Sequence, residues 1–131
     1  MIDVIKSIFA VIGAGLGYFF GGLDGLMIAL IVFVVVDYVT GVIVAIINKT
    51  LSSEVGFIGI AKKVFIFLLV GIANILDVYV IKTGSMVRSA VICFYIANEG
   101  ISIVENAGNM GLPLPKKLKD VLEQLKEKSE E

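Results

Sequence analysis

An acidic side chain stands inside a stretch of sequence that is otherwise apolar enough to cross a membrane. The run LIVFVVVDYVTGVIVAII, residues 30–47, carries Asp37 near its centre, with Thr40 and Gly41 three and four residues later. On a helix these three positions share one face. A carboxylate at the centre of a bilayer costs roughly 2.5–3.5 kcal/mol on insertion scales, so an intramembrane acid indicates a functional site.

Two further apolar runs carry polar side chains at helical spacing. One run contains Asn74 and Asp77, and the other has a polar stripe made of Tyr95, Asn98, Glu99, Ser102, Glu105 and Asn106. Intramembrane polar groups usually face a bundle interior or a water-filled cavity. The candidates to line an aqueous passage are Asp37, Thr40, Asn74, Asp77, Asn98, Glu99 and Ser102. The alternative is that these residues only hold helices together through hydrogen bonds.

The sequence offers these acids no obvious cationic partner. Lys49, Lys63 and Lys82 fall at the ends of the apolar runs, so no basic residue is expected at the depth of the acids. We therefore expect the acids to be neutralised by protons, by hydrogen bonds or by contact with water.

Catalytic and metal-binding patterns are missing from the sequence. The chain has no His, no metal-ligand spacing, no G-x-S-x-G pattern and no Ser or Cys nucleophile with a base. Its single cysteine, Cys93, lies in an apolar run and is expected to be a buried hydrophobic side chain. No basic tract is long enough to follow a phosphate backbone. We expect no enzymatic activity, no metal or other cofactor, and no nucleic-acid partner.

The composition places these residues on membrane-spanning helices. Of the 131 residues, 58% are hydrophobic and 18% are charged, against about 25% charged in soluble domains. A helix needs about 17–25 residues to cross the hydrocarbon core. Charged residues bracket four apolar runs, which gives expected spans of about residues 7–23, 25–48, 64–81 and 89–104. The sequence predicts an all-α integral membrane protein with three or four transmembrane helices, because the first run is marginal and the fourth is short and polar.

Small residues in the apolar runs predict close helix contacts. The first run repeats the GxxxG spacing, which lets helix backbones approach because nothing projects from the glycines. The expected packing positions are Ala10, Gly13, Gly17, Gly21, Gly41 and Gly71. The stripe on the first run can pack within one bundle or between copies of the chain, and the sequence favours neither.

The end of the chain is rich in charged residues, unlike the apolar runs before it. Residues 1–111 form the expected transmembrane domain, and residues 112–131 form a charged tail that opens with prolines. Leu114, Leu118, either Val121 or Leu122, and Leu125 recur at helical spacing among charged residues, which predicts a short amphipathic helix that starts near Pro115. This helix can pack on its own protein, lie on the membrane surface or join two copies.

Basic residues set the expected orientation, because cytoplasmic loops carry an excess of Lys and Arg. The connection over residues 48–63 carries three lysines, and the tail opens with three more. With four spans, the amino terminus, this connection and the carboxy terminus all face the cytoplasm. Lys82 and Arg88 are the exceptions to this orientation.

Three motifs carry a resemblance to a known family. They are VDYVTGVIVAIINK (residues 36–49), SSEVGFIGIAKKV (residues 52–64) and FYIANEGISIVENAGNMGLPLPKKLKDVLEQLK (residues 94–126). Through them the chain resembles the toxin-secretion and phage-lysis holin family of Gram-positive bacteria and their phages. The resemblance implies a homo-oligomer in the bacterial cytoplasmic membrane that forms large lesions, through which an endolysin or a large toxin leaves the cell.

Two other functions remain open from the residues alone. A small proton-coupled membrane transporter also has about four short helices with an intramembrane acid. Such a transporter usually binds cationic aromatic substrates against Glu and Trp or Tyr, whereas this chain has no Trp and spreads its acids over three helices. The other possibility is a passive structural subunit of a larger membrane complex.

Overall fold

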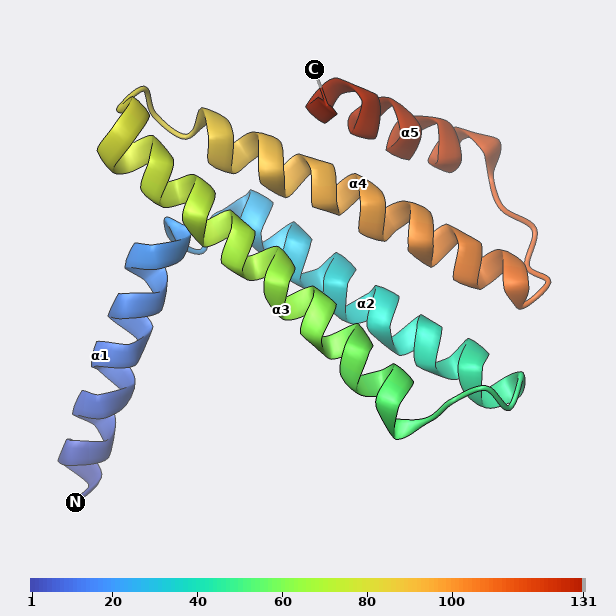
Figure 1. Ribbon diagram of the computed structural model, residues 1–131, viewed down its shortest axis with the longest axis horizontal. Helices are drawn as coiled ribbons and strands as arrows, with labels where there is room; N and C mark the ends of the chain where they lie inside the picture. Colours follow the sequence, from blue (N-terminus) through green and yellow to red (C-terminus); the bar gives the residue numbers. More distant parts are fainter. Residues whose placement is uncertain (131) are drawn as a thin grey trace.

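The protein is built from helices joined by short turns, as Figure 1 shows. The computed structural model describes residues 1–130. Its helices are α1 (Ile2–Phe20), α2 (Gly25–Ile47), α3 (Ser53–Ile75), α4 (Met86–Asn109) and α5 (Lys116–Glu130), and a π-helical segment, Leu76–Ile81, continues α3. Within residues 1–130 there is no strand, so the predicted all-α fold is confirmed.

Four helices are long and apolar enough to cross a membrane. They are α1, α2, the continuous helix Ser53–Ile81 and α4. At 1.5 Å per residue, even α1 with its 19 residues reaches about 28 Å, close to the thickness of a hydrocarbon core. The outer faces are covered by large apolar side chains, such as Val32, Val35 and Val39 on α2. Lipid is a suitable solvent for such a surface, because lipid tails are as apolar as these side chains.

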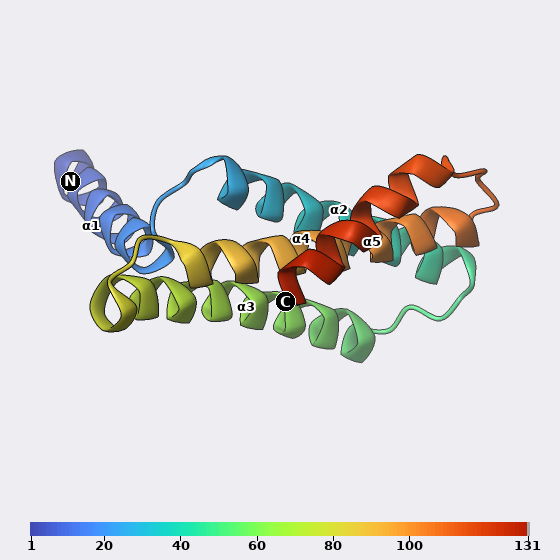
Figure 2. The same cartoon turned by 90° about the horizontal axis from the view of Figure 1, so that it is seen from above.

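Helices α2, α3 and α4 form the packed part of the molecule. They lie side by side in both views (Figures 1 and 2) and surround a core made of Met27, Leu30, Val34, Val70, Ile92 and Ile96. Leu30, Val70 and Ile92 are fully buried. This apolar core fills the half of the bundle nearest the turn between α3 and α4.

Helix α1 leaves the bundle at an angle (Figure 1). None of its residues is buried, and only its carboxyl end contacts α3. The helix ends at Gly21, whose φ of 82° is in the left-handed region that glycine adopts without strain. Asp24 then caps α2 by accepting a hydrogen bond from the amide of Met27. The turn over residues 21–24 therefore fixes where α1 attaches.

Helix α3 begins earlier than the sequence predicts. Ser52 caps it by accepting a hydrogen bond from the amide of Val55, so residues 53–63 are helical and the loop expected there is wrong. The expected span begins at residue 64 because the charge of Lys63 bounds the apolar run. In the structure Gly56 and Gly59 lie against the side chain of Tyr38 on α2. The early start of α3 places Lys63 in the middle of the bundle.

Helix α5 folds back along α4 after the two prolines (Figure 2). It begins at Lys116, as the sequence predicts to within one residue. Leu122 is its buried side chain, and Leu125 packs at the edge of the bundle core. Of the three placements open for this helix, the structure has the one in which it packs on its own chain.

Candidate functional site

A charge cluster lies between the three bundle helices, and we call its members Asp37, Lys63 and Glu99 the central charge cluster. The Nζ of Lys63 on α3 lies 2.7 Å from Oδ2 of Asp37 on α2 and 2.9 Å from Oε1 of Glu99 on α4. The side chains are 10%, 17% and 8% exposed for Asp37, Lys63 and Glu99 respectively. Each bundle helix therefore contributes one charged residue to one buried site.

Hydrogen bonds from neutral side chains complete the central charge cluster. The Nδ2 of Asn106 donates to Oδ1 of Asp37 at 3.2 Å and to Oγ1 of Thr40 at 2.9 Å. The Thr40 hydroxyl in turn donates to the carbonyl of Val36 at 2.8 Å. No buried side-chain nitrogen or oxygen in the described part of the chain lacks a hydrogen-bond partner. A fully satisfied polar network fixes one arrangement of helices.

The central charge cluster lies ten residues from the same end of all three bundle helices. Asp37 is ten residues before the end of α2 at Ile47, Lys63 ten residues after the start of α3, and Glu99 ten residues before the end of α4. Ten residues of helix measure about 15 Å, half of a 30 Å hydrocarbon core. The expectation that no basic residue shares the depth of the acids is therefore wrong. Lys63 was missed because its position depends on the early start of α3.

The electrostatics of the central charge cluster are those of a buried ion pair with a second acid. Desolvation of the charges is expensive, and their attraction offsets it only when geometry and hydrogen bonds are good. One ammonium group balances one carboxylate, so the site is neutral when the two acids hold one proton between them. Any separation of α2, α3 and α4 leaves charged groups without partners unless water reaches them.

Two hollows flank the central charge cluster. One, of about 250 Å³, is bordered by Tyr38, Gly56, Asn106 and the pair Asp37–Lys63. The other, of about 440 Å³, is bordered by Asn98, Ser102, Glu99, Lys62 and Lys63, among others. Of the predicted candidates, Asp37, Thr40, Asn98, Glu99 and Ser102 thus come together around one position. Ser102 borders both hollows.

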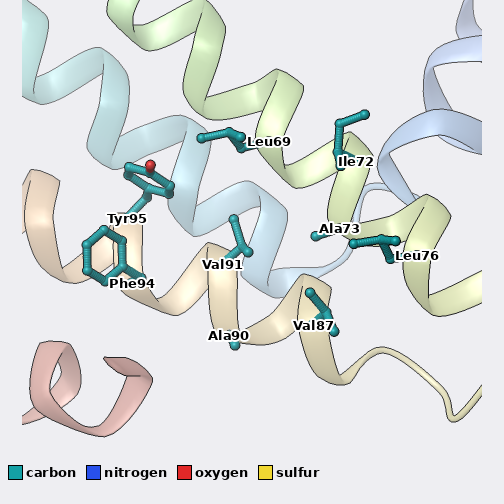
Figure 3. Close-up of a pocket in the computed structure, with 9 residues that line it drawn as sticks. All are labelled: Leu69, Ile72, Ala73, Leu76, Val87, Ala90, Val91, Phe94 and Tyr95. Atoms are coloured by element: carbon teal, nitrogen blue, oxygen red, sulfur yellow. The ribbon is translucent and has the colours of Figure 1, made fainter. Parts of the chain in front are cut away.

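A groove between α3 and α4 is lined by apolar side chains. It has a volume of about 370 Å³ and is lined by the residues of Figure 3: Leu69, Ile72, Ala73, Leu76, Val87, Ala90, Val91, Phe94 and Tyr95. Its wall is apolar except for the Tyr95 hydroxyl. No residue that lines this groove is charged, so the groove differs from the central charge cluster and from a second polar site near α1.

The structure places Asn74 and Asp77 in that second site, away from Asp37 and Glu99. Asn74 donates from Nδ2 to the carbonyls of Tyr18 at 3.1 Å and Phe19 at 3.0 Å, which are at the end of α1. Asp77 accepts from the amides of Val87 at 3.0 Å and Arg88 at 2.8 Å. Asp77 thereby caps the first turn of α4 from the preceding helix, where a carboxylate also complements the helix dipole.

Arg88 joins the same site, whereas the sequence predicts only a loop charge at this position. The side chain is 3% exposed, and its guanidinium donates from Nε to the Phe20 carbonyl at 2.6 Å. It also forms a two-point contact with Asp24, at 2.8 and 3.2 Å. The hydrogen bond from Arg88, helped by the amide of Met27, lowers the pKa of Asp24 below its usual value. We call Asp24, Asn74, Asp77 and Arg88 the corner cluster.

The predicted packing glycines fall into two groups. Gly21 and Gly71 lie at close contacts, since a Cβ at Gly71 would overlap the ring of Phe19, and one at Gly21 would lie 2.5 Å from Oδ1 of Asn74. Gly41 faces Asn106, whose Nδ2 would be 3.7 Å from an added Cβ. Gly13 and Gly17 have no atom within 4 Å of an added Cβ, and Ala10 is exposed. Among the described residues, Gly13 and Gly17 of the small-residue stripe on α1 therefore have no packing partner.

Comparison with known proteins identifies the family. A model of the bacteriophage holin family matches residues 14–127. An uncharacterized protein of Halalkalibacterium halodurans is 42% identical over 127 residues, which cover 94% of each chain. An uncharacterized 14.9 kDa protein in the nagH 3′ region of Clostridium perfringens is 41% identical over 128 residues, covering 98% of this chain and 97% of its own. No solved structure matches. The chain belongs to the bacteriophage holin family.

Proposed function

We propose that this protein is a holin that oligomerises in the bacterial cytoplasmic membrane and forms lesions large enough to release a folded endolysin or a large toxin. The family is one of non-enzymatic membrane proteins. The observation that carries the proposal is the central charge cluster, which brings one charged residue from each bundle helix to one buried site ten residues from the same end of the three helices. A protein that only anchors itself in lipid has no need of that arrangement, which costs desolvation energy.

The central charge cluster supplies a physical route between a closed and an open form. In the closed form Lys63 holds both acids, Asn106 also donates to Asp37, and the outer face of α2 is apolar. When copies of the chain assemble, water enters between them. Water then replaces the contacts that Asp37, Glu99 and Lys63 make with one another. Thr40, Asn98 and Ser102 add polar surface at the same depth. A polar surface in contact with water opposes closure of the lesion by lipid.

The corner cluster has a different role in this proposal. Asn74, Asp77 and Arg88 bind the end of α1 and the start of α4, so they position the first helix. The body of α1 is left free to contact other copies through Ala10, Gly13 and Gly17.

We place the amino and carboxy termini in the cytoplasm. The lysine-rich connection and tail then lie inside, as basic residues do in membrane proteins. Arg88 ends up near the outer surface, which is normally unfavourable. Its charge is paired with Asp24 and is 3% exposed, so it does not act as a free loop cation.

A liposome assay tests this function. Purified protein is inserted into vesicles that hold a small dye, a dextran and a folded lytic enzyme. The proposal predicts release of all three, with the enzyme retaining its activity. Retention of the dextran and the enzyme while small solutes pass would contradict it.

A small proton-coupled transporter is the second candidate, and one observation favours it. The central charge cluster holds two acids beside a hollow of about 440 Å³, which is the kind of place where a transporter exchanges a proton for a substrate. The same vesicles separate the two functions. A transporter moves small ions in response to a pH gradient and never releases the enzyme.

A further inference from the structure

An exposed lysine without a partner borders the larger of the two hollows beside the central charge cluster. Lys62 of α3 is exposed and forms no ion pair with any described residue, whereas the ammonium of Lys63 lies between two acids. Both lysines border the hollow of about 440 Å³, together with Asp37, Glu99 and the exposed Asn98. Lys63 is one cation for two acids, so one carboxylate is short of a counter-charge while Lys62 has no anion beside it.

The hollow continues into the apolar groove between α3 and α4. Leu69 and Tyr95 border both the hollow and the groove of about 370 Å³. In Figure 3, Tyr95 lies at one end of the groove and Val87 lies toward the other end. From Tyr95 to Val87 the groove follows α4 for about 12 Å, most of the depth of one leaflet. A polar hollow that opens into an apolar groove suits the headgroup and one acyl chain of a phospholipid.

Lys62 lies at a level where phospholipid headgroups are expected. From Lys62 to Ile81, α3 and its π-helical continuation measure about 30 Å, the thickness of a hydrocarbon core. Helix α5 indicates a similar level on α4, because its Leu122 packs against Gly100 while its exposed side carries charges such as Glu123. Those charges require water or headgroups beside them. Headgroups on this side of the bundle therefore reach the hollow.

We infer that the hollow and the groove together bind one phospholipid whose headgroup carries a primary ammonium. The phosphate pairs with Lys62 and accepts a hydrogen bond from the amide of Asn98, while the ammonium lies against Glu99. One acyl chain runs along the groove. Every charge at the site is then balanced, which an anionic phospholipid does not achieve because it has no cation for the second acid. This site goes beyond the proposed function, which requires no particular lipid.

An introduced tryptophan tests the site, because the chain has no Trp of its own. Ile72→Trp places the indole in the groove, and Val35→Trp places it on the outer face of α2. The two native side chains are equally exposed, at 54%, so the second variant is a matched control. The proteins are inserted into phosphatidylcholine vesicles that hold a small fraction of phosphatidylethanolamine or phosphatidylglycerol with brominated acyl chains, which quench tryptophan.

The expected result is a lipid preference confined to the groove. At Ile72→Trp the apparent affinity for phosphatidylethanolamine should exceed that for phosphatidylglycerol about tenfold, as expected for one hydrogen-bonded charge pair. At Val35→Trp the two brominated lipids should quench equally.

Two substitutions in the Ile72→Trp protein identify the partners of the headgroup. Lys62→Met should weaken binding of phosphatidylethanolamine about tenfold, and the loss is confined to the lipid because Lys62 has no ion pair within the described chain. Lys6→Met removes an exposed lysine of α1 and should bind as the parent does. Glu99→Gln removes the partner of the ammonium, so the preference for phosphatidylethanolamine over phosphatidylglycerol should be lost or reversed.

Three results would overturn the inference. One is the same lipid preference at Ile72→Trp and Val35→Trp. Another is a preference at Ile72→Trp that survives both Lys62→Met and Glu99→Gln. The third is an absence of quenching at Ile72→Trp by any brominated lipid, because protein and not lipid would then cover the groove. None of these measurements depends on release of an enzyme, so they are independent of the test of the proposed function.

Discussion

Lys63 and Asp37 form an ion pair of 2.7 Å between α3 and α2, ten residues from the start of α3 and ten from the end of α2. The same ammonium group lies 2.9 Å from Glu99 on α4, so one cation joins two acids on two other helices. The intramembrane acids are therefore not isolated charges. They are held in the closed bundle by a partner of opposite charge, and the bundle cannot loosen without exposing that partner too.

Loss of Lys63 should be more damaging than loss of its neighbour. Lys63→Met leaves two buried acids without their cation, and breaking a buried pair in this way typically costs about 3–5 kcal/mol. Lys62→Met removes an exposed lysine one position away and should change stability little. Thermal unfolding of the purified variants in detergent measures both effects.

A neutral cluster provides the control for that experiment. Lys63→Met combined with Asp37→Asn and Glu99→Gln removes all three charges together, so no unpaired charge stays buried. The triple variant should recover most of the stability lost in Lys63→Met. Equal stability of Lys63→Met and the wild type would show that the ion pair does not hold the bundle.

Substitution on the α1 stripe should disturb assembly and leave the single chain intact. Gly17 has no atom within 4 Å of an added Cβ, so Gly17→Leu meets no obstacle in the monomer. If copies pack through this stripe, the leucine overpacks their contact, which typically costs about 1–3 kcal/mol. We expect normal membrane insertion, less crosslinked oligomer and delayed lysis.

Gly15 is the matched control for Gly17. It is equally open within the chain, and a separation of two residues turns it to the other side of the helix. Gly15→Leu should assemble and lyse as the wild type does. If both variants behave alike, the stripe faces lipid.

Acid should loosen the attachment of α1 through Asp24. Because the folded chain lowers the pKa of this carboxyl, the Asp24–Arg88 pair stabilises the attachment at pH values above the usual aspartate pKa of about 3.9. That contribution is lost as the pH falls through the lowered pKa. The distance between spin labels on exposed Val11 and Leu68 should stay constant from pH 8 to 5. Its distribution should broaden below about pH 4.

Asp24→Asn separates this effect from the titration of other acids. The amide keeps the size of the side chain but carries no charge, so the labels should show a broader separation at neutral pH. On acidification the distance distribution of the labels should also change less in the variant than in the wild type. An identical pH response in the two proteins would mean that another group controls the attachment.

The helical fold was predictable because apolar runs bounded by charges carry their own signal. The start of α3 was not, since Lys62 and Lys63 bound the apolar run although the helix begins ten residues earlier. Ser52 followed by Glu54 was the available signal for that helix start.

The candidate site was predictable only in part. Asp37, Glu99 and Thr40 were found from helical spacing, but the partners of the acids lie far along the chain. Lys63 is 26 residues from Asp37 and 36 from Glu99, and Arg88 is 64 from Asp24. No local pattern encodes contacts of that range. Asp77 was expected within a span, and its real use as the cap of α4 depends on the turn that brings the two helices together.

In the proposed lesion the central charge cluster becomes part of a surface in contact with water. Lysis timing with Asp37→Asn and Asp37→Leu tests this role most directly. Asparagine keeps the size and hydrogen bonding of Asp37 but removes its charge, while leucine removes both. Culture turbidity after induction and release of a reporter enzyme are measured at matched membrane levels of each variant. We predict that Asn shifts the timing or the lesion size and that Leu blocks lysis more severely. Wild-type timing and release in both variants would contradict the account.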